Sequence, residues 1–375
     1  MHSISRRTVA GRLVGISSAI LISLLFATSV WADAPAGLDK TGKPALKAAG
    51  PLAFAPNGVL FVADPASATI FALDTGEREA VATRAPINVT GLDVKLAAAF
   101  GTTADQILIN DLAVNPETGT AYLSVTRGKG EKAMPVIAKV NAAGEVSELM
   151  LDKIAYGSAA LPNAPADGAD GRGRNPRMDS ITDMAFYDSK LIIAGLSNEE
   201  FASKLRAVAF PFSQTDGGTS VEVYHGAHGA FETRSPVRTF VPFNIGNEPH
   251  LLAAYTCTPL VKFPVSKLTP GTKVRGTTVA ELGNMNQPLD MIVYEKGGKN
   301  WLLLANSKRG VMKIATDNIE RSEGIETPVK GTEGQKYDTV ADLTNVIHLD
   351  KYSPTQAILL VKNDKGTDLQ TINLP

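Results

Sequence analysis

The sequence predicts an all-β fold built from repeated antiparallel sheets, and three observations predict it. One pattern recurs six times: an apolar strand, a tight polar turn, a second strand rich in Val, Ile and Leu, a polar loop and a third strand. The copies begin about 50 to 70 residues apart, which is a period typical of propellers and other repeat arrays. Short strands alternate with turn signals, and helical patterns are almost absent. We therefore predict a six-bladed β-propeller.

The repeats can be followed along the chain. The six copies begin at Pro51, Asp111, Asp183, Val237, Asp290 and Asn345. The first copy contains Pro56-Asn57-Gly58, and Asn and Gly accept the positive φ that hairpin turns require. The second strands are apolar on both faces, as expected for strands in the middle of a blade. Only residues 94–100 and 198–206 have a pattern that favours helical turns.

The first 32 residues have the pattern of an export signal. Arg6, Arg7 and Arg12 form a basic head, and an apolar run follows it up to Val30-Trp31-Ala32. Small residues at the −3 and −1 positions predict cleavage after Ala32, by the Sec or the twin-arginine route. An uncleaved membrane anchor is the alternative, since the apolar run is long enough to span a bilayer. Cleavage predicts a periplasmic or secreted protein without a membrane span.

The mature chain divides into two parts. Residues 49–375 contain the six repeats, and residues 33–48 precede them as a linker. The last copy ends after its third strand, at Pro375. A propeller closes its ring when an outer strand is supplied from the other end of the chain. We therefore predict that residues near Lys40–Lys47 complete the sixth blade.

Composition excludes several classes of function. Removal of residues 1–32 leaves 34 basic and 38 acidic residues, a formal charge of −4, so there is no basic face for nucleic acid. Cys257 is the only cysteine, which excludes an intramolecular disulfide and covalent c-type haem. No Gly-x-Ser-x-Gly nucleophile motif is present. The partners that remain are a small-molecule ligand or another exported protein.

Polar residues at the start of the innermost strands are candidates for a binding site at the mouth of the central channel. Residues at this position and in the loops between second and third strands meet at the same face of a four-stranded blade. An Asp at this position also commonly bonds its own backbone, which is a purely structural role. The candidates for the channel mouth are Asn110, Asp111, Asp183, Arg238, Asp290, Asn345 and Glu199.

The repeats resemble the six-bladed propellers of the NHL type and of the gluconolactonase (regucalcin-like) family. The resemblance implies a divalent metal held in the channel by Glu, Asn and Asp, and hydrolysis of lactones. Asn110-Asp111 matches the family's Asn-Asp motif, and Asp290 keeps the Asp of its Pro-Asp-Gly motif. Ala49 replaces the metal-binding Glu, and Thr182-Asp183 stands near the later Asn position. Loss of one carboxylate weakens such a site for Ca²⁺.

A second candidate site lies in the segment that leads into the fourth copy. His225 and His228 are followed by Glu232, and Cys257 lies in a loop of the fourth copy itself. Two imidazoles, a thiolate and a carboxylate suit Cu or Zn. The alternative is that the histidines are turn residues and Cys257 is a small core residue. Ca, Cu and Zn are therefore the metals that the sequence suggests.

These patterns favour an exported propeller that binds a small ligand or a metal at its channel mouth, in a binding or accessory role. Two alternatives remain open. The first is a metal-dependent hydrolase of the lactonase kind with an altered metal site, in which Asp290 or Asp183 is the base. The second is a protein-interaction platform without chemistry of its own.

Overall fold

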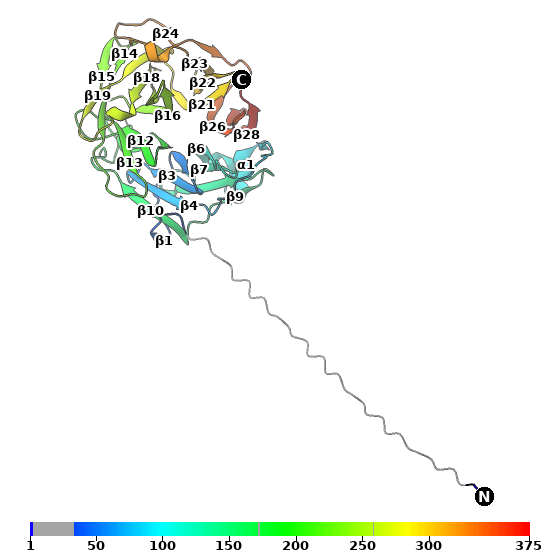
Figure 1. Ribbon diagram of the computed structural model, residues 1–375. Coiled ribbons are helices and arrows are strands. Elements are labelled where there is room, and N and C mark those ends of the chain that lie inside the picture. The colour runs from blue at the N-terminus through cyan, green and yellow to red at the C-terminus, as the bar shows by residue number, and fades with distance from the viewer. Residues whose placement is uncertain (3–33, 172, 258) are drawn as a thin grey trace. The chain divides into compact units, whose positions relative to one another are not determined.

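Six sheets, antiparallel except for one pair of strands in the third blade, surround a central axis (Figure 1), so the protein is a six-bladed β-propeller. The computed structural model describes residues 1–2, 34–171, 173–257 and 259–375. Each blade is numbered by the position of its innermost strand along the chain. The second strands are largely buried because both of their faces pack against neighbouring blades: β3 below is buried along its whole length, and β22 over its last five residues.

From the axis outward, blades 1 to 3 contain the following strands. Blade 1 comprises β2 (Leu52–Ala55), β3 (Val59–Asp64), β4 (Thr69–Asp74), β10 (Ile154–Ala160) and β1 (Lys40–Gly42). Blade 2 comprises β6 (Ile107–Val114), β7 (Ala121–Arg127), β8 (Met134–Val140) and β9 (Val146–Glu148). Blade 3 comprises β11 (Asp183–Tyr187), β12 (Lys190–Leu196), β13 (Ser203–Ala209), β14 (Thr219–His225) and β15 (Ala230–Glu232), and β14 also pairs with β19 (Lys273–Arg275).

Blades 4 to 6 follow the same plan. Blade 4 comprises β16 (Val237–Ile245), β17 (Glu248–Tyr255), β18 (Pro259–Pro264), β20 (Thr277–Glu281) and β24 (Glu333–Gly334). Blade 5 comprises β21 (Pro288–Lys296), β22 (Lys299–Asn306), β23 (Gly310–Ala315) and β25 (Tyr337–Thr339). Blade 6 comprises β26 (Val346–Ser353), β27 (Gln356–Asn363), β28 (Gly366–Asn373) and β5 (Asn88–Val89).

Helices are short. The α-helix α1 spans Leu92–Ala99, and single 3₁₀ turns occur at η1 (Ala104–Gln106), η2 (Gly130–Lys132), η3 (Pro176–Asp179), η4 (Val265–Lys267) and η5 (Ile319–Arg321). The helical turn expected near residues 94–100 is therefore present. The one expected at 198–206 is wrong, because residues 203–206 begin strand β13. No helix in the described part of the chain is long and apolar enough to cross a membrane.

The blades do not follow one another around the ring in chain order. The innermost strands contact each other in the order β2, β6, β26, β21, β16, β11 and back to β2. Blade 2 therefore lies between blades 1 and 6, and blade 3 lies on the other side of blade 1. The hydrophobic core agrees, because one buried cluster joins Leu112 and Leu123 of blade 2 to Ile358 and Leu360 of blade 6. In Figure 1, β26 and β28 accordingly lie next to β6 and α1.

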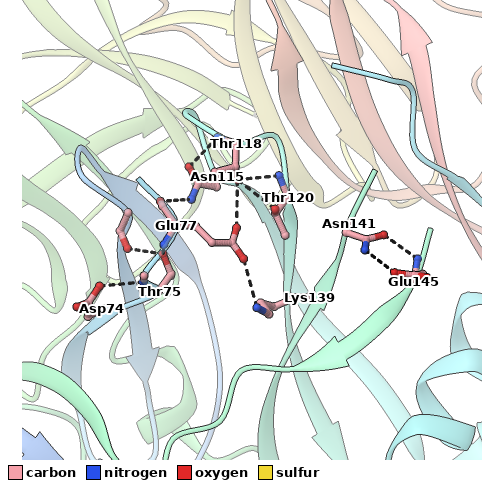
Figure 2. Close-up of polar contacts among 11 residues, drawn as sticks. Asp74, Thr75, Glu77, Asn115, Thr118, Thr120, Lys139, Asn141 and Glu145 are labelled. Carbon is pink, nitrogen blue, oxygen red and sulfur yellow. Dashed lines mark hydrogen bonds and ion pairs between the residues drawn. The ribbon is translucent and has the colours of Figure 1, made fainter. Parts of the chain in front are cut away.

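Polar contacts tie blade 1 to blade 2 (Figure 2). Glu77 follows β4, and its carboxylate accepts hydrogen bonds from Thr118 Oγ1 at 3.1 Å and Lys139 Nζ at 3.2 Å. The Nδ2 of Asn115 donates to the Glu77 carbonyl at 3.0 Å. The loop after β4 is thereby fixed against the turns of the neighbouring blade.

The ring closes in a different way from the one predicted for residues 40–47. Strand β1 pairs with β10 at the outer edge of blade 1. Blade 6 is completed by β5, in which Val89 lies opposite Leu369 and Asn88 opposite Gln370. The predicted closing strand was wrong because it assumed that blade 6 neighbours blade 1. The predicted signal peptide, residues 1–32, lies outside the described residues except for residues 1 and 2.

Candidate functional site

A cavity of about 860 Å³ occupies the centre of the ring. All six innermost strands contribute to its wall, with apolar side chains such as Phe54, Met184 and Phe240. Carboxylates from several blades interrupt this apolar wall: Asp111, Asp183, Asp290 and Asp350. Apolar cavities of this size with a few convergent polar groups are the usual form of a small-molecule site.

Bulges at the start of the innermost strands aim these polar side chains. The pairing register shifts by one residue immediately before Asp111, Thr239, Asp290 and His348. A β-bulge leaves one residue unpaired and redirects its neighbours, and bulges are common beside active sites. The four residues therefore occupy equivalent positions in blades 2, 4, 5 and 6, and Asp183 begins the corresponding strand of blade 3.

The carboxylates also fasten adjacent blades together. Each accepts a backbone N–H from the innermost strand of a neighbour: Asp111 from Leu52, Asp183 from Phe240, Asp290 from Leu349 and Asp350 from Val114, at 2.7 to 3.0 Å. Asp183, Asp290 and Asp350 accept a second bond from the next residue of their own strand. The structural role expected for an Asp at this position is therefore present.

His348 lies between two of these carboxylates. Its Nδ1 is 3.4 Å from Asp111 Oδ1 and 3.6 Å from Asp290 Oδ2, and the three side chains are only 17 to 19% exposed. Burial opposes the positive charge of the imidazolium. The interactions with Asp111 and Asp290 outweigh burial and raise the pKa of His348 to about 10. The site therefore holds a cation at neutral pH.

For the other carboxylates, burial prevails and disfavours the charged form. Burial, followed by the negative charges of Asp290 and Asp111, raises the pKa of Asp183 well above its usual range. Burial is also the main cause that raises the pKa of Asp350 to about 7, against the two N–H bonds that lower it. Burial raises the pKa of Asp290 although His348 counteracts it. Within the described residues, Asp183 and Asp350 form no ion pair.

The structure separates the predicted channel-mouth residues into two groups. Asp111, Asp183 and Asp290 line the cavity. Asn110 and Arg238 are the unpaired bulge residues, and they do not line it. Asn110 donates to Ala49 O and Thr126 Oγ1, and Arg238 bonds Thr256 Oγ1 and Asp179 Oδ1.

The remaining two predicted residues are also absent from the cavity wall. Glu199 pairs with Lys204 and accepts a bond from Asn163. Asn345 is exposed and has a positive φ of 57° before the start of β26. The binding role of the seven residues stays a prediction, and the geometry restricts it to the three aspartates.

His348 and Asp350 are the functional candidates that the sequence analysis missed. The last repeat was aligned at Asn345, three residues too early. A signal was present: the motif Asp-Leu-Ala at Asp111 and Asp-Met-Ile at Asp290 corresponds to His348-Leu349-Asp350 if the bulge is allowed for.

The second predicted cluster is brought together near the edge of blades 3 and 4. Ligand atoms of His225, His228 and Cys257 lie within 4.8 Å of one another. The Oε1 of Glu232 is 3.2 Å from His225 Nδ1 and 2.5 Å from His228 Nδ1. The neighbouring His225, with Ser235 and His228, lowers the pKa of Glu232 to about 2 against the effect of burial.

Comparisons with known proteins give only distant structural likenesses. No protein-family model matches the sequence, and no curated protein matches it. The PQQ-bound aldose sugar dehydrogenase of Streptomyces coelicolor aligns with 89% of this chain and 96% of its own, at 13% identity and a TM-score of 0.34. A putative oxidoreductase (glucose dehydrogenase) of Thermus thermophilus aligns with 89% of this chain and 99% of its own, at 11% identity and a TM-score of 0.30. The WD40 propeller domain of Doa1 aligns with 89% of this chain and 95% of its own, at 8% identity and a TM-score of 0.32. Scores this low support no inference about the site or its chemistry.

Proposed function

We propose that the protein binds a small, positively charged organic ligand in the central cavity. The observation that carries this proposal is the pair of carboxylates, Asp111 and Asp290, that lie 3.4 and 3.6 Å from the Nδ1 of His348 and raise its pKa in spite of burial. The carboxylates around His348 favour positive charge beside the cavity, whose wall also includes Arg84 and Lys351. The proposed role is therefore ligand binding, which is the role that the sequence favours for the channel mouth.

Asp183 and Asp350 are the groups that a ligand cation would contact. Both line the cavity, and their oxygens hold only backbone N–H bonds. An ammonium or guanidinium group needs one or two acceptor lone pairs, which these carboxylates still offer. The apolar walls beside them suit the hydrocarbon part of an organic cation. The cavity volume of about 860 Å³ is within the usual range for small-molecule sites.

The residues present do not fit the divalent metal that the lactonase resemblance implies. Ala49 is buried at the position of the family's Glu, and its carbonyl is bonded by Asn110, which points away from the cavity. The remaining pair, Asp111 and Asp290, already holds the His348 imidazolium. A hard cation requires six to eight oxygen ligands and would have to displace this charge. Asp111, Asp290 and His348 still place three ligand atoms within 4.8 Å of one another, but these are fewer than the oxygen ligands that a hard cation requires, so we derive no hydrolytic step through a metal.

The proposal is tested with mature protein and a panel of amines, each paired with the neutral alcohol of the same skeleton. Calorimetric titration should detect saturable binding of at least one amine and not of its alcohol. Asp350→Asn and Asp183→Asn should weaken that binding by about tenfold or more, since each removes a charge partner. Asp342→Asn, which replaces an exposed carboxylate in a turn, should leave it unchanged.

The pH provides a second criterion. Because a cation favours the ionised carboxylates, affinity should rise between pH 5 and 8, through the pKa of about 7 of Asp350. If alcohols bind as well as amines, or if no amine binds, the proposal fails. Binding of Ca²⁺ that is lost in Asp111→Asn would instead favour the hydrolase.

We also propose that the propeller acts outside the cytoplasm, as residues 1–32 predict. The support is the basic head, the apolar run and the small residues before Ala32. N-terminal sequencing of protein from the periplasmic fraction should begin at residue 33. Recovery of the intact chain only from the cytoplasm would contradict export.

A further inference from the structure

A hairpin on blade 3 presents two histidines. Strand β14 ends at His225, and β15 returns along it, with His225 opposite Ala230 and Val223 opposite Glu232. The turn between them contains His228, and the N–H groups of His228 and Gly229 both donate to the His225 carbonyl, at 3.1 and 2.8 Å. This tight turn places the imidazole centres 3.9 Å apart.

Blade 4 supplies a thiol to the same place. Cys257 follows β17, and its N–H donates to Asn286 O at 2.7 Å. Its φ is +62°, a left-handed conformation that is uncommon for residues other than Gly and Asn. Such backbone conformations are held by the surrounding structure and are frequent at functional sites. The sulfur belongs to the group of three ligand atoms that lie within 4.8 Å of one another.

Several buried polar atoms near the two histidines lack a hydrogen-bond partner. His225 is 2% exposed, and neither of its ring nitrogens has a hydrogen-bond partner. Its Nδ1 is close to Glu232 Oε1, but the alignment does not make a hydrogen bond. Glu281 is 1% exposed, and its Oε1 accepts the Gly226 N–H at 2.6 Å while its Oε2 has no partner. Each unsatisfied buried group costs about 1–3 kcal/mol, so the arrangement is incomplete without a ligand.

We propose that His225, His228 and Cys257 bind one transition-metal ion of borderline or soft character, zinc or copper. Two imidazoles and a thiolate are the ligands that these metals prefer. Around such an ion, ligand atoms stand roughly 3.5 Å apart, as Zn–N and Zn–S bond lengths of about 2.0–2.3 Å require. The three ligand atoms lie within 4.8 Å of one another, so they would have to approach by roughly 1 Å when the ion binds.

Glu232 has a supporting role in this site and is not one of the three ligands. Its Oε1 contacts His228 Nδ1 at 2.5 Å, which leaves the Nε2 of that ring for the metal, and it lies 3.2 Å from His225 Nδ1. A carboxylate that receives the second ring N–H fixes the tautomer and orientation of a metal-binding histidine. The sequence analysis had placed Glu232 among the ligands. Buried Glu281 also lies close to the turn that carries the histidines, since it accepts the Gly226 N–H.

The test uses mature protein freed of metal with a chelator and kept reduced. Zn²⁺, Cu²⁺ and Co²⁺ are each titrated, and bound metal is measured by mass spectrometry after gel filtration. We expect one ion per chain. Co²⁺ or Cu²⁺ should also give a thiolate-to-metal absorption band, and competition between Zn²⁺ and Cu²⁺ identifies the preferred metal.

Three variants separate metal binding from folding. Cys257→Ser should abolish the thiolate band, and Cys257→Ser and His228→Gln should each weaken binding by at least about tenfold. His250→Gln, which removes a buried imidazole elsewhere in blade 4, should bind metal as the wild type does. Since His228 is exposed, His228→Gln should fold even if a His225 variant does not.

Two results would overturn the proposal. The first is that the wild type binds much less than one metal ion per chain. The second is that Cys257→Ser still binds one ion per chain and still gives the thiolate-to-metal absorption band. The site is independent of the central cavity. Failure of amine binding therefore leaves this proposal standing, and failure of metal binding leaves the cavity proposal standing.

Discussion

Asp350 shows how one carboxylate serves both the fold and the candidate site. It faces the cavity, and its two oxygens accept the N–H groups of Val114 and Lys351 at 2.7 and 2.6 Å. Two donors stabilise a carboxylate and would lower its pKa, yet burial and the nearby negative charges prevail and raise the pKa to about 7. The folded protein therefore holds a proton at a pH where an unfolded chain has lost it.

This proton makes stability depend on pH. An ordinary Asp has a pKa near 3.8, so between pH about 4 and 7 the folded state binds more protons than the unfolded state. The contribution of Asp350 to the free energy of unfolding should fall as pH rises through this window, by on the order of 1–4 kcal/mol, and change no further above it. Guanidinium unfolding at pH 5 and pH 8 measures the difference.

Asp350→Asn isolates the contribution of this residue. The amide does not titrate, so the variant should lose less stability between pH 5 and 8 than the wild type, whatever its absolute stability. Asp342→Asn should retain the wild-type difference. An equal loss in wild type and Asp350→Asn would show that Asp350 does not hold the proton.

At the same scale, the sequence predicted three of the four cavity aspartates. Asp111, Asp183 and Asp290 begin apolar strands and could be recognised by position. Asp350 and the neighbouring His348 were missed, because a bulge shifts the register of β26 by one residue and the last copy was therefore aligned at Asn345, although the motif resembles those at Asp111 and Asp290. For the same reason, Asn110 and Arg238 were placed in the cavity although they occupy the bulges of β6 and β16.

The short strand β5, at the edge of blade 6, contributes more to closure of the ring than its length suggests. Strand β5 has two residues, but Ile87 before it is fully buried in the core between blades 2 and 6. The backbone of Ile87 bonds Thr371 in both directions: its N–H donates to Oγ1, and its carbonyl accepts the Thr371 N–H, each at 3.0 Å. A pair of residues with no alternating pattern gives no strand signal, so the sequence could not predict this closure.

Ile87→Ala should therefore destabilise the protein by about 2–5 kcal/mol, the usual cost of a cavity in a closed core. Thr41→Ala, in exposed strand β1, should change the free energy of unfolding by less than about 0.5 kcal/mol. Denaturant unfolding of the two variants compares how much the segments at β5 and at β1 contribute to the free energy of unfolding. Equal effects of the two substitutions would contradict a stabilising closure of the ring through β5.

The prediction of a helical turn at residues 198–206 was wrong because buried charged residues interrupt the usual alternation of apolar and polar residues in a strand. Residues 198–206 favoured a helical turn, yet β13 contains Lys204 and Arg206, which are 3% and 1% exposed. Because charged residues are rarely so deeply buried, Lys204 and Arg206 were read as surface residues. The pattern of apolar and polar residues along 198–206 then resembled that of a helical turn instead of a strand. Arg206 has its pKa lowered to about 10, mainly by burial.

For the whole molecule, the number of blades was predictable and their order was not. Six repeats of one pattern predict six sheets, because each copy must bury its apolar faces against a neighbour. Which neighbour it meets depends on the connections, and those that lead to β5 and β10 lack a distinctive sequence. The consequence reaches the site, since the ring order places Asp111 and Asp290 on the two sides of β26, where both reach His348.

The charge of His348 is the most direct test of the central claim, that the cavity assembled by these blades favours a cation. Side-chain ¹⁵N NMR spectra across pH distinguish imidazolium from imidazole, and His348→Gln assigns the signal among the five histidines. We predict that the His348 signal stays that of the imidazolium beyond pH 8 and titrates near pH 10. Titration near pH 6.5, the value of an unperturbed histidine, would contradict the account.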